Sequence, residues 1–340
     1  MGAVFKTESA LTVWSAPTRL LQRLADGQWQ RGEHLVQATG LSSQEVVLAI
    51  EALTPCGVVV ERTATAYRLG VAIDLLDQVI LHSLLTESLG PRLERLETVL
   101  VTDSTNGDLL ADGAPTPGCL RVRAAEFQRA GRGRRGRAWL QPLGSGVCVS
   151  IDWVFTRDAR ALGALGLAAG VAVVRALQRF SISDVTLKWP NDVLKSGAKL
   201  GGVLCELRAL ADGASHVVIG VGLNVTLPQV TRAAIVASGG LVPADLQDET
   251  RDTPSRTRLV AALVEELSAA VVEFEVRGLD SFLIEWGRLD ALRNQAVRVQ
   301  GPQGTYDGVA QGIAVDGGLQ VESAGRTFSL HAGEVTVRAF

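Results

Sequence analysis

The segment most suited to chemistry on anions is rich in arginine and glycine and spans residues 128–139. It reads Gln-Arg-Ala-Gly-Arg-Gly-Arg-Arg-Gly-Arg-Ala-Trp, and residues 121–137 hold seven arginines against one acid, Glu126. Guanidinium groups present a fixed fork of donors that fits carboxylates and phosphates, and glycine lets the backbone approach a ligand closely. We expect an anion-binding loop that is mobile when empty, because its charges repel one another.

Three other readings of this loop compete with the first. Gly131, Gly133 and Gly136 spell GxGxxG, which alone is typical of a dinucleotide-binding fold. Pro142 and Gly144 follow where the phosphate-binding helix of that fold would begin, which argues against it. An arginine-glycine RNA-binding segment remains an alternative. A plain solvated loop explains so dense a cluster of arginines poorly.

A lysine stands at the end of a predicted strand in residues 188–192, Lys-Trp-Pro-Asn-Asp. Proline cannot continue a strand ladder, so the chain must turn and leave Lys188 at the rim of the sheet. Together with the arginine loop, this makes Lys188 a candidate phosphate contact. Asp192 could help hold a magnesium ion, although turns often contain Asn-Asp for structural reasons.

Two further polar segments lie beside apolar strands. Residues 103–106, Asp-Ser-Thr-Asn, follow an apolar strand and by themselves are typical of a helix N-cap. Residues 220–225, Gly-Val-Gly-Leu-Asn-Val, place two glycines and an asparagine in an otherwise buried strand. Such an interruption indicates that a ligand approaches the backbone there.

The region from about 90 to 288 must position these segments, and it mixes strands with helices. Short apolar or alternating runs predict strands at 96–101, 119–126, 146–154, 184–189, 200–207 and 215–224. Apolar residues at helical spacing predict helices at 158–179 and 256–276. Hairpin-like spacing of the later strands favours a mixed or antiparallel sheet over a strict βαβ succession.

The two ends of the chain differ from this centre. Residues 17–70 show helical leucine spacing, a capping-box sequence from Ser42 to Glu45 and two short strands, the order of a winged helix-turn-helix. Residues 291–340 hold short runs separated by glycines and turns, which predict a small all-β barrel of about five strands. We therefore expect an α+β protein with three domains, at 1–75, 85–288 and 291–340.

Composition excludes several classes of protein. A formal net charge of -3 argues against a surface coated with nucleic-acid-binding charge. The cysteines form no CxxC pair and the histidines are scattered, so we expect neither a disulfide framework nor a zinc site. Charges near the start argue against a signal peptide, and the longest apolar stretch is too short to cross a bilayer. We expect a cytoplasmic protein with no membrane part.

Taken in order, the motifs resemble those of the bacterial biotin protein ligase family, whose larger members also repress biotin operons. The resemblance adds Lys-Leu-x-Gly-x-Leu-x-Glu at 199–206 to the four segments above and extends over essentially the whole chain. It implies a winged helix, a catalytic domain of the biotin/lipoate ligase type and an SH3-like barrel. It also implies that ATP activates biotin to biotinyl-5′-AMP, with magnesium, for transfer to a lysine of the biotin carboxyl carrier protein of acetyl-CoA carboxylase.

The resemblance assigns roles to individual residues of this chain. Catalytic roles are assigned to Lys188, Arg134 and Arg132. Contacts with biotin are assigned to Ser104, Thr105, Asn106, Gln128, Arg132, Gly133, Arg134, Lys188 and Gly202. Contacts with ATP are assigned to Arg134, Arg135, Arg137, Trp139, Lys188, Asn191, Asn224 and Arg338. Asp192 is the candidate magnesium ligand.

Repression would require the N-terminal unit to bind DNA, and its charge weakens that inference. Residues 32–60 contain no Lys or Arg, and residues 1–70 contain six basic and six acidic side chains. Affinity for DNA comes largely from phosphate neutralisation, so this surface is unpromising. The candidates are Ser43 and Gln44 for bases, and Arg62 and Arg68 for phosphates. Operator DNA as a partner and a homodimer are left open.

Residues 228–246 lie where the family caps its adenylate. Their apolar residues suit a cap, but no tryptophan is present, which puts ligand-driven ordering and the coupled dimerisation in doubt. Two rival functions remain. One is a lipoate-type ligase, which accounts for neither the arginine loop nor the Lys-Trp-Pro-Asn-Asp turn. The other is a nucleic-acid-binding regulator that uses the arginine loop.

Overall fold

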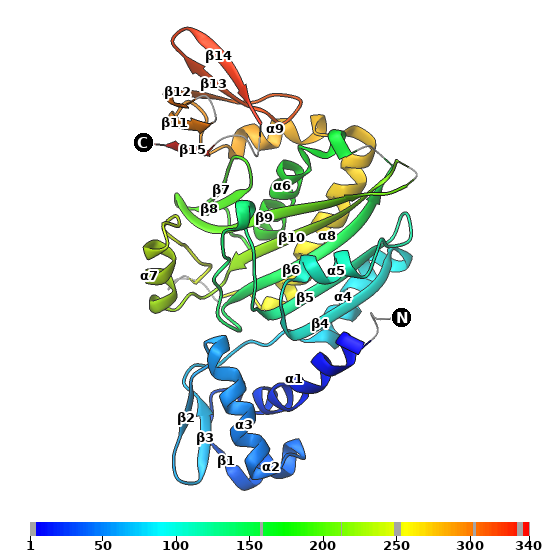
Figure 1. The fold of residues 1–340 in the computed structure, drawn as a ribbon, viewed down its shortest axis with the longest axis vertical. Helices are drawn as coiled ribbons and strands as arrows, with labels where there is room; N and C mark the ends of the chain where they lie inside the picture. The colour runs from blue at the N-terminus through cyan, green and yellow to red at the C-terminus, as the bar shows by residue number, and fades with distance from the viewer. Residues whose placement is uncertain are drawn as a thin grey trace.

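The computed structural model describes residues 5–156, 159–211, 213–247, 253–301, 304–331 and 336–339. Three parts follow one another along the longest axis of the molecule (Figure 1). The N-terminal helices lie at one end, a seven-stranded sheet lies in the middle, and a five-stranded sheet lies at the other end. The three parts follow one another in sequence order.

The central sheet is mixed, as expected from the strand spacing. Its order is β4 (Leu93–Thr102), β5 (Leu120–Gln128), β6 (Gly146–Phe155), β10 (Ser215–Asn224), β9 (Ala198–Ala209), β8 (Asp192–Lys195) and β7 (Val185–Lys188). β4 and β5 pair in parallel across the short helix α5 (Thr105–Ala111), and the other neighbours pair antiparallel. The short strand β8 was not predicted.

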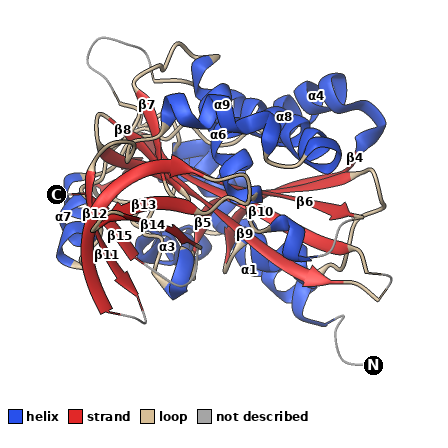
Figure 2. Ribbon diagram, turned by 90° about the horizontal axis from the view of Figure 1, so that it is seen from above, coloured by secondary structure: helices blue, strands red, loops and turns tan. Residues whose placement is uncertain are grey.

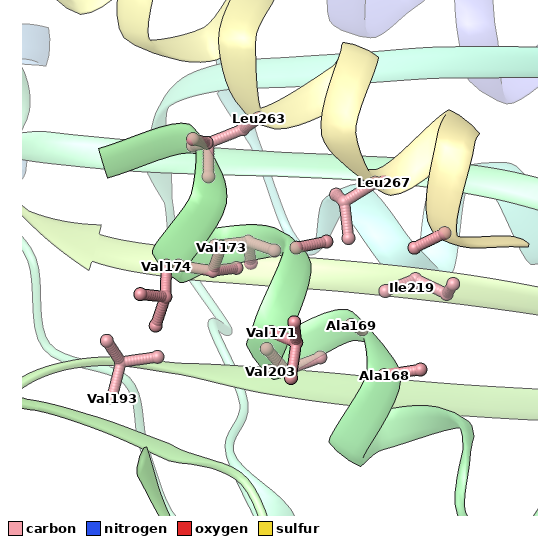
Figure 3. Close-up of a cluster of buried hydrophobic side chains, with 14 of the residues drawn as sticks. Ala168, Ala169, Val171, Val173, Val174, Val193, Val203, Ile219, Leu263 and Leu267 are labelled. Carbon is pink, nitrogen blue, oxygen red and sulfur yellow. The ribbon is translucent and has the colours of Figure 1, made fainter. Parts of the chain in front are cut away.

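Helices cover one face of this sheet (Figure 2). They are α4 (Gln78–Leu89), α6 (Leu165–Gln178), α8 (Arg256–Arg277) and α9 (Asp280–Leu289). Alanines and valines of α6 pack between leucines of α8 and the strand residues Val193, Val203 and Ile219 (Figure 3). The small side chains let helix and sheet approach closely, which explains why α6 is buried on nearly every side.

One expected helix differs from the structure. In place of a helix over 158–179, a 3-10 turn at Ala159–Leu162 precedes α6, which begins at Leu165. Gly163 and Ala164 separate the two elements. The expected helix at 256–276 is present as α8, whereas α4, α9 and α7 (Gln229–Ala237) were not predicted.

The N-terminal part holds α1 (Phe5–Leu24), α2 (Gly32–Thr39), α3 (Ser43–Leu53) and a sheet of β1 (Gln30–Arg31), β3 (Ala66–Leu69) and β2 (Val60–Arg62). The expected capping box forms at the start of α3, where Ser42 and Glu45 satisfy each other's backbone donors. This part has a buried cluster of its own, built mainly from leucines of α1, α2 and α3.

The C-terminal part is an antiparallel sheet in the order β14 (Arg326–Leu330), β13 (Leu319–Ser323), β12 (Gly304–Ile313), β11 (Ala296–Gly301) and β15 (Thr336–Ala339). Its buried residues Val297, Leu319 and Val321 belong to the same cluster as the central sheet. The two parts therefore share one core. The expected domain boundaries stay predictions.

The sequence led us to expect neither a disulfide framework nor a membrane-spanning helix, and the described residues bear on both expectations. All four cysteines are free. No helix within the described ranges combines the length and the apolar character that a membrane span requires.

Candidate functional site

A cavity of about 850 Å³ opens beside strands β9 and β10. Every residue assigned to biotin, ATP or magnesium lines it, with the exception of Arg338. The lining combines the polar segment at 104–106, the arginine loop, the 188–192 turn and the glycines of β10. The motifs are far apart in sequence, and the sheet brings them to one place.

The floor of the cavity is a hydrogen-bonded polar network at the start of α5. Ser104 caps this helix by accepting from the Gly107 backbone N–H, and the Thr105 backbone N–H donates to Gln128 Oε1 at 2.8 Å. Ser150 Oγ of β6 lies 2.7 Å from Thr105 Oγ1, within hydrogen-bond distance. Sequence reasoning missed Ser150, although a serine within the apolar run of 146–154 was a signal. These polar groups can be buried in the floor because each of them has a hydrogen-bond partner.

Asn106 extends this network towards the arginine loop. Its Nδ2 donates to Glu206 Oε2 at 2.8 Å, and its Oδ1 accepts from Ser150 at 2.6 Å. The other oxygen of Glu206 lies 3.2 Å from the Arg132 guanidinium. Glu206 thus joins the floor to the loop, and it was absent from the residues assigned above.

The two glycines of β10 make room for neighbouring side chains. A Cβ at Gly220 would lie 2.2 Å from Asn106 Oδ1, and one at Gly222 would lie 2.6 Å from the Trp139 ring. Both glycines also line the cavity. Glycine is therefore needed at both positions to leave room for Asn106 and Trp139. This structural reason for the glycines stands beside the expected approach of a ligand.

The arginine loop folds back on itself over the cavity. Gly133 N–H donates to the Arg137 carbonyl at 2.7 Å, and Trp139 N–H donates to the Gly131 carbonyl at 2.8 Å. Burial lowers the pKa of the half-buried Arg134, the positive charges of Arg135 and Arg137 lower it further, and the carboxylate of Asp192 opposes them. The loop therefore concentrates positive charge where an anion would relieve the repulsion.

The 188–192 turn brings the second group of charges to the cavity. Lys188 ends β7 and is paired in register with Asp192, which begins β8. The Asp192 carboxylate lies 2.5 Å from Lys199 Nζ, and that nitrogen lies 5.9 Å from the centroid of the Trp139 ring. Lys199 also lines the cavity. It was quoted in a motif above but was given no role.

The asparagines assigned to ATP are held by the backbone. Asn191 Nδ2 donates to the Val203 carbonyl at 2.9 Å, and Asn224 Nδ2 donates to the Ala244 carbonyl at 2.9 Å. Asn224 Oδ1 is buried with no partner among the described residues, so a donor from a ligand would satisfy it.

A magnesium ion fits this site only as a companion of phosphate. The described ranges contain no cluster of three or more His, Cys, Asp or Glu side chains that could hold a metal. Asp192 offers one carboxylate at the cavity, and carboxylate is a preferred ligand of magnesium. Magnesium is commonly held by one or two carboxylates together with substrate phosphates.

Two other predictions fall outside the cavity lining. The backbone of Arg338 pairs with Arg298 in the C-terminal sheet, but its side chain lies outside the described residues. The expected apolar cap is present in part, since Ile235 of α7 and Leu241 line the cavity. Val230 of the same segment is 76% exposed.

The residues assigned to DNA lie in the N-terminal part and not at the cavity. Ser43 and Gln44 are exposed in the first turn of α3, and Arg62 is exposed at the end of β2. Arg68 forms an ion pair with Glu61 at 2.6 Å and stacks over the ring of Trp29 at 4.8 Å. Its charge is therefore already partly balanced.

Comparisons with known proteins found matches to both the central and the C-terminal part of the chain. The biotin/lipoate A/B protein ligase family matches residues 99–224, and the biotin protein ligase C-terminal domain matches residues 294–338. The bifunctional ligase/repressor BirA of Salmonella typhimurium is 32% identical over 327 residues, covering 96% of this chain and 98% of the relative. The biotin--[acetyl-CoA-carboxylase] ligase of Mycobacterium tuberculosis is 35% identical over 255 residues, covering 72% and 90%.

Solved structures show the same fold. The biotin protein ligase from Aquifex aeolicus in complex with biotin and ATP has a TM-score of 0.58 at 23% identity, and it covers 73% of this chain and 100% of that chain. Another structure of the Aquifex aeolicus enzyme has a TM-score of 0.57 at 20% identity over the same shares. With the identity to full-length relatives, this shows that the chain belongs to the biotin protein ligase family.

Proposed function

We propose that the protein joins biotin to ATP as biotinyl-5′-AMP and then transfers the biotinyl group to a lysine of the biotin carboxyl carrier protein of acetyl-CoA carboxylase. The observation that carries the proposal is the cavity in which a polar floor, an arginine loop and Lys188 meet. Its volume of about 850 Å³ suits a vitamin and a nucleotide together. The names of the relatives support the same reaction.

The floor suits the ureido head of biotin. Ser104, Thr105, Asn106 and Gln128 are held in one hydrogen-bonded network, so their polar groups are oriented before a ligand arrives. The biotin tail then extends past Gly202 towards the arginine loop and Lys188, where its carboxylate meets cations. Trp139 and Asn224 lie beside the same cavity and suit the adenine.

The first chemical step brings negative groups together. The biotin carboxylate attacks the α-phosphorus of ATP, a new C–O–P linkage forms, and pyrophosphate leaves. Lys188, Arg132, Arg134 and Arg137 neutralise the anions that meet there, and loss of one such preorganised donor commonly costs about 10²–10³ in rate. Magnesium, held by the phosphates and Asp192, would supply further neutralisation when bound.

The second step consumes a reactive product. Biotinyl-5′-AMP is a mixed anhydride that water hydrolyses, so the arginine loop should cover it until the acceptor arrives. The neutral amine of the acceptor lysine then attacks the biotinyl carbonyl. An amide bond forms, AMP leaves, and the amine loses a proton.

One assay separates the proposal from both rivals. The protein is incubated with ATP and either biotin or lipoate, and pyrophosphate release is measured. We expect release with biotin and little with lipoate; release only with lipoate supports the lipoate-type ligase, and release with neither favours the nucleic-acid-binding regulator. Lys188→Ala should slow release by at least about 10²-fold. The matched control is Lys195→Ala, at the far end of the same strand pair and outside the cavity lining.

We further propose that the N-terminal part is a winged helix-turn-helix that binds biotin-operator DNA, beside an SH3-like barrel at the C-terminus. The relatives named ligase/repressor support this, as do the exposed Ser43 and Gln44 of α3. If Arg62 and Arg68 supply the phosphate contacts, the affinity should fall with salt at a logarithmic slope of about -2 per protomer. A gel shift with a biotin-gene promoter, at several salt concentrations and with biotin and ATP, tests the proposal; no shift would make this part a packing or partner surface.

Two proposals about the whole protein follow from the same reading. A homodimer on the operator would appear as a doubling of the sedimenting mass when biotin and ATP are added. A cytoplasmic location would place the enzyme with its carrier protein, and cell fractionation would test it.

A further inference from the structure

The backbone around Lys188 is held from both sides by the C-terminal part of the chain. On one side, the Leu187 carbonyl accepts from the Ala291 backbone N–H at 2.9 Å, and Leu187 forms a parallel bridge with Asp290. On the other side, the Trp189 indole Nε1–H donates to the Gly317 carbonyl at 3.1 Å. Both chain neighbours of Lys188 are therefore fastened by residues beyond 289.

The acceptor Gly317 lies in a tight turn between β12 and β13. The turn closes where Ala314 N–H donates to the Gly318 carbonyl and Gly317 N–H donates to the Ala314 carbonyl, both at 2.9 Å. Gly317 has φ +83°, and a Cβ there would lie 2.7 Å from Ala164 Cβ at the start of α6. The turn is thus wedged between α6 and Trp189, and a side chain at 317 would push it away.

Lys188 needs these contacts because its own strand, β7, is short and does little to fix its position. β7 is four residues long and lies at the end of the strand order, and Pro190, two residues after the strand, cannot continue the ladder. Trp189 is 2% exposed and belongs to the core that the central and C-terminal sheets share. A misplacement of about 1 Å in a catalytic group can cost about 10²-fold in rate.

We propose that the C-terminal sheet sets the position of Lys188, with Trp189 and Gly317 as positioning residues. The turn at 314–318 holds the Trp189 indole, the 290–291 segment holds Leu187, and Lys188 is aimed into the cavity between these two fixed points. This inference rests on the proposed role of Lys188 in adenylate formation.

The first test is Trp189→Phe, which keeps a buried ring and removes the donor to Gly317. The matched control is Trp286→Phe, because Trp286 is also 2% exposed in the same core and its Nε1 has no acceptor among the described residues. We expect Trp189→Phe to lower the kcat of pyrophosphate release about ten- to a hundredfold, with KM for biotin nearly unchanged. Trp286→Phe should keep its kcat. Equal losses in both variants would overturn the proposal.

The second test moves the turn without touching the cavity. Gly317→Ala places a methyl against Ala164, whereas Gly325→Ala, at φ +74° in the β13–β14 turn, meets nothing within 4 Å. Both variants bear the same backbone strain, so only the displacement of the turn differs. We expect Gly317→Ala to reproduce the kcat loss of Trp189→Phe, and Gly325→Ala to retain the kcat of the unaltered protein.

Amide hydrogen exchange makes the inference independent of activity. The peptide covering residues 187–192 should exchange faster in Trp189→Phe and Gly317→Ala than in the two controls. Unchanged exchange in that peptide would refute the positioning role, whatever the assay shows. If the unaltered protein releases no pyrophosphate with biotin, the ligase proposal fails. If the peptide still exchanges faster in Trp189→Phe and Gly317→Ala than in their controls, the positioning of residue 188 by the C-terminal sheet is nevertheless supported.

Discussion

The two ends of the chain are joined to the central sheet in different ways. The N-terminal part buries its leucines in a cluster of its own, whereas the buried residues of the C-terminal sheet belong to the central core. A part with its own core can move or unfold as a unit, and a part that shares a core cannot leave without exposing it. This difference suits the N-terminal part to regulation, and it fits the proposed role of the C-terminal sheet in positioning Lys188.

The N-terminal cluster packs against the central region, including residues of β4 and β5. Leu143 of the central region is buried in the N-terminal cluster, and its N–H donates to the Cys56 carbonyl at 2.9 Å. A Cβ at Gly57 would lie 2.9 Å from Pro142 Cβ. These contacts lie in the segment that follows Trp139, so the junction is connected to the cavity by a few residues of chain.

The largest expected effect comes from removing the C-terminal sheet. A chain ending at residue 289 loses the partners of Leu187 and Trp189 and exposes the shared core. We expect pyrophosphate release to fall by at least about 10²-fold. Activity within tenfold of the full chain, in a folded sample, would show that the sheet is dispensable and would remove the contrast between the two ends.

Matched leucine truncations test whether the cores are separate. Leu319→Ala and Leu35→Ala each remove a side chain that is at most 1% exposed, and each should cost about 2–5 kcal/mol. In a urea titration, Leu319→Ala should shift the transition of the central sheet. Leu35→Ala should shift only that of the N-terminal part. One common transition that shifts in both variants would show a single cooperative unit.

Removal of residues 1–69 should have a smaller effect on catalysis. This cut retains Asp74 and Asp77, whose groups bond Arg256 and Thr257 of the central region. We expect pyrophosphate release within about tenfold of the full chain, because the cavity and its core remain. A loss as large as that of the C-terminal truncation would mean that the junction at Leu143 also shapes the site.

Thiol alkylation should show, without any mutation, whether the N-terminal part opens separately from the central core. Burial raises the pKa of Cys56 to about 11 and that of Cys148 to about 12. Little thiolate therefore exists at pH 8, and iodoacetamide should react with either only after its surroundings open. In rising urea, followed by mass spectrometry, Cys56 should be labelled before Cys148. Simultaneous labelling would contradict separate opening of the N-terminal part.

Much of the site was predictable because its motifs are local and their order resembles that of a family. Ser104, Gln128, Lys188 and the arginine loop were all assigned from short segments, and the structure places them on one cavity. Their individual roles stay proposals. The partners that hold them were not predictable, because Glu206 reaches Asn106 across 100 residues of chain and Trp189 reaches Gly317 across 128.

The sequence by itself determined the local elements and the kinds of chemistry available. Capping, strand alternation and turn residues depend on neighbours a few positions apart, so the Ser42–Glu45 box formed as expected. Only the tertiary structure decided which part of the chain supports which side chain. The C-terminal sheet joins the central core through contacts between distant segments, and one of these is the hydrogen bond from Trp189, the neighbour of Lys188, to Gly317. No short sequence pattern encodes such contacts.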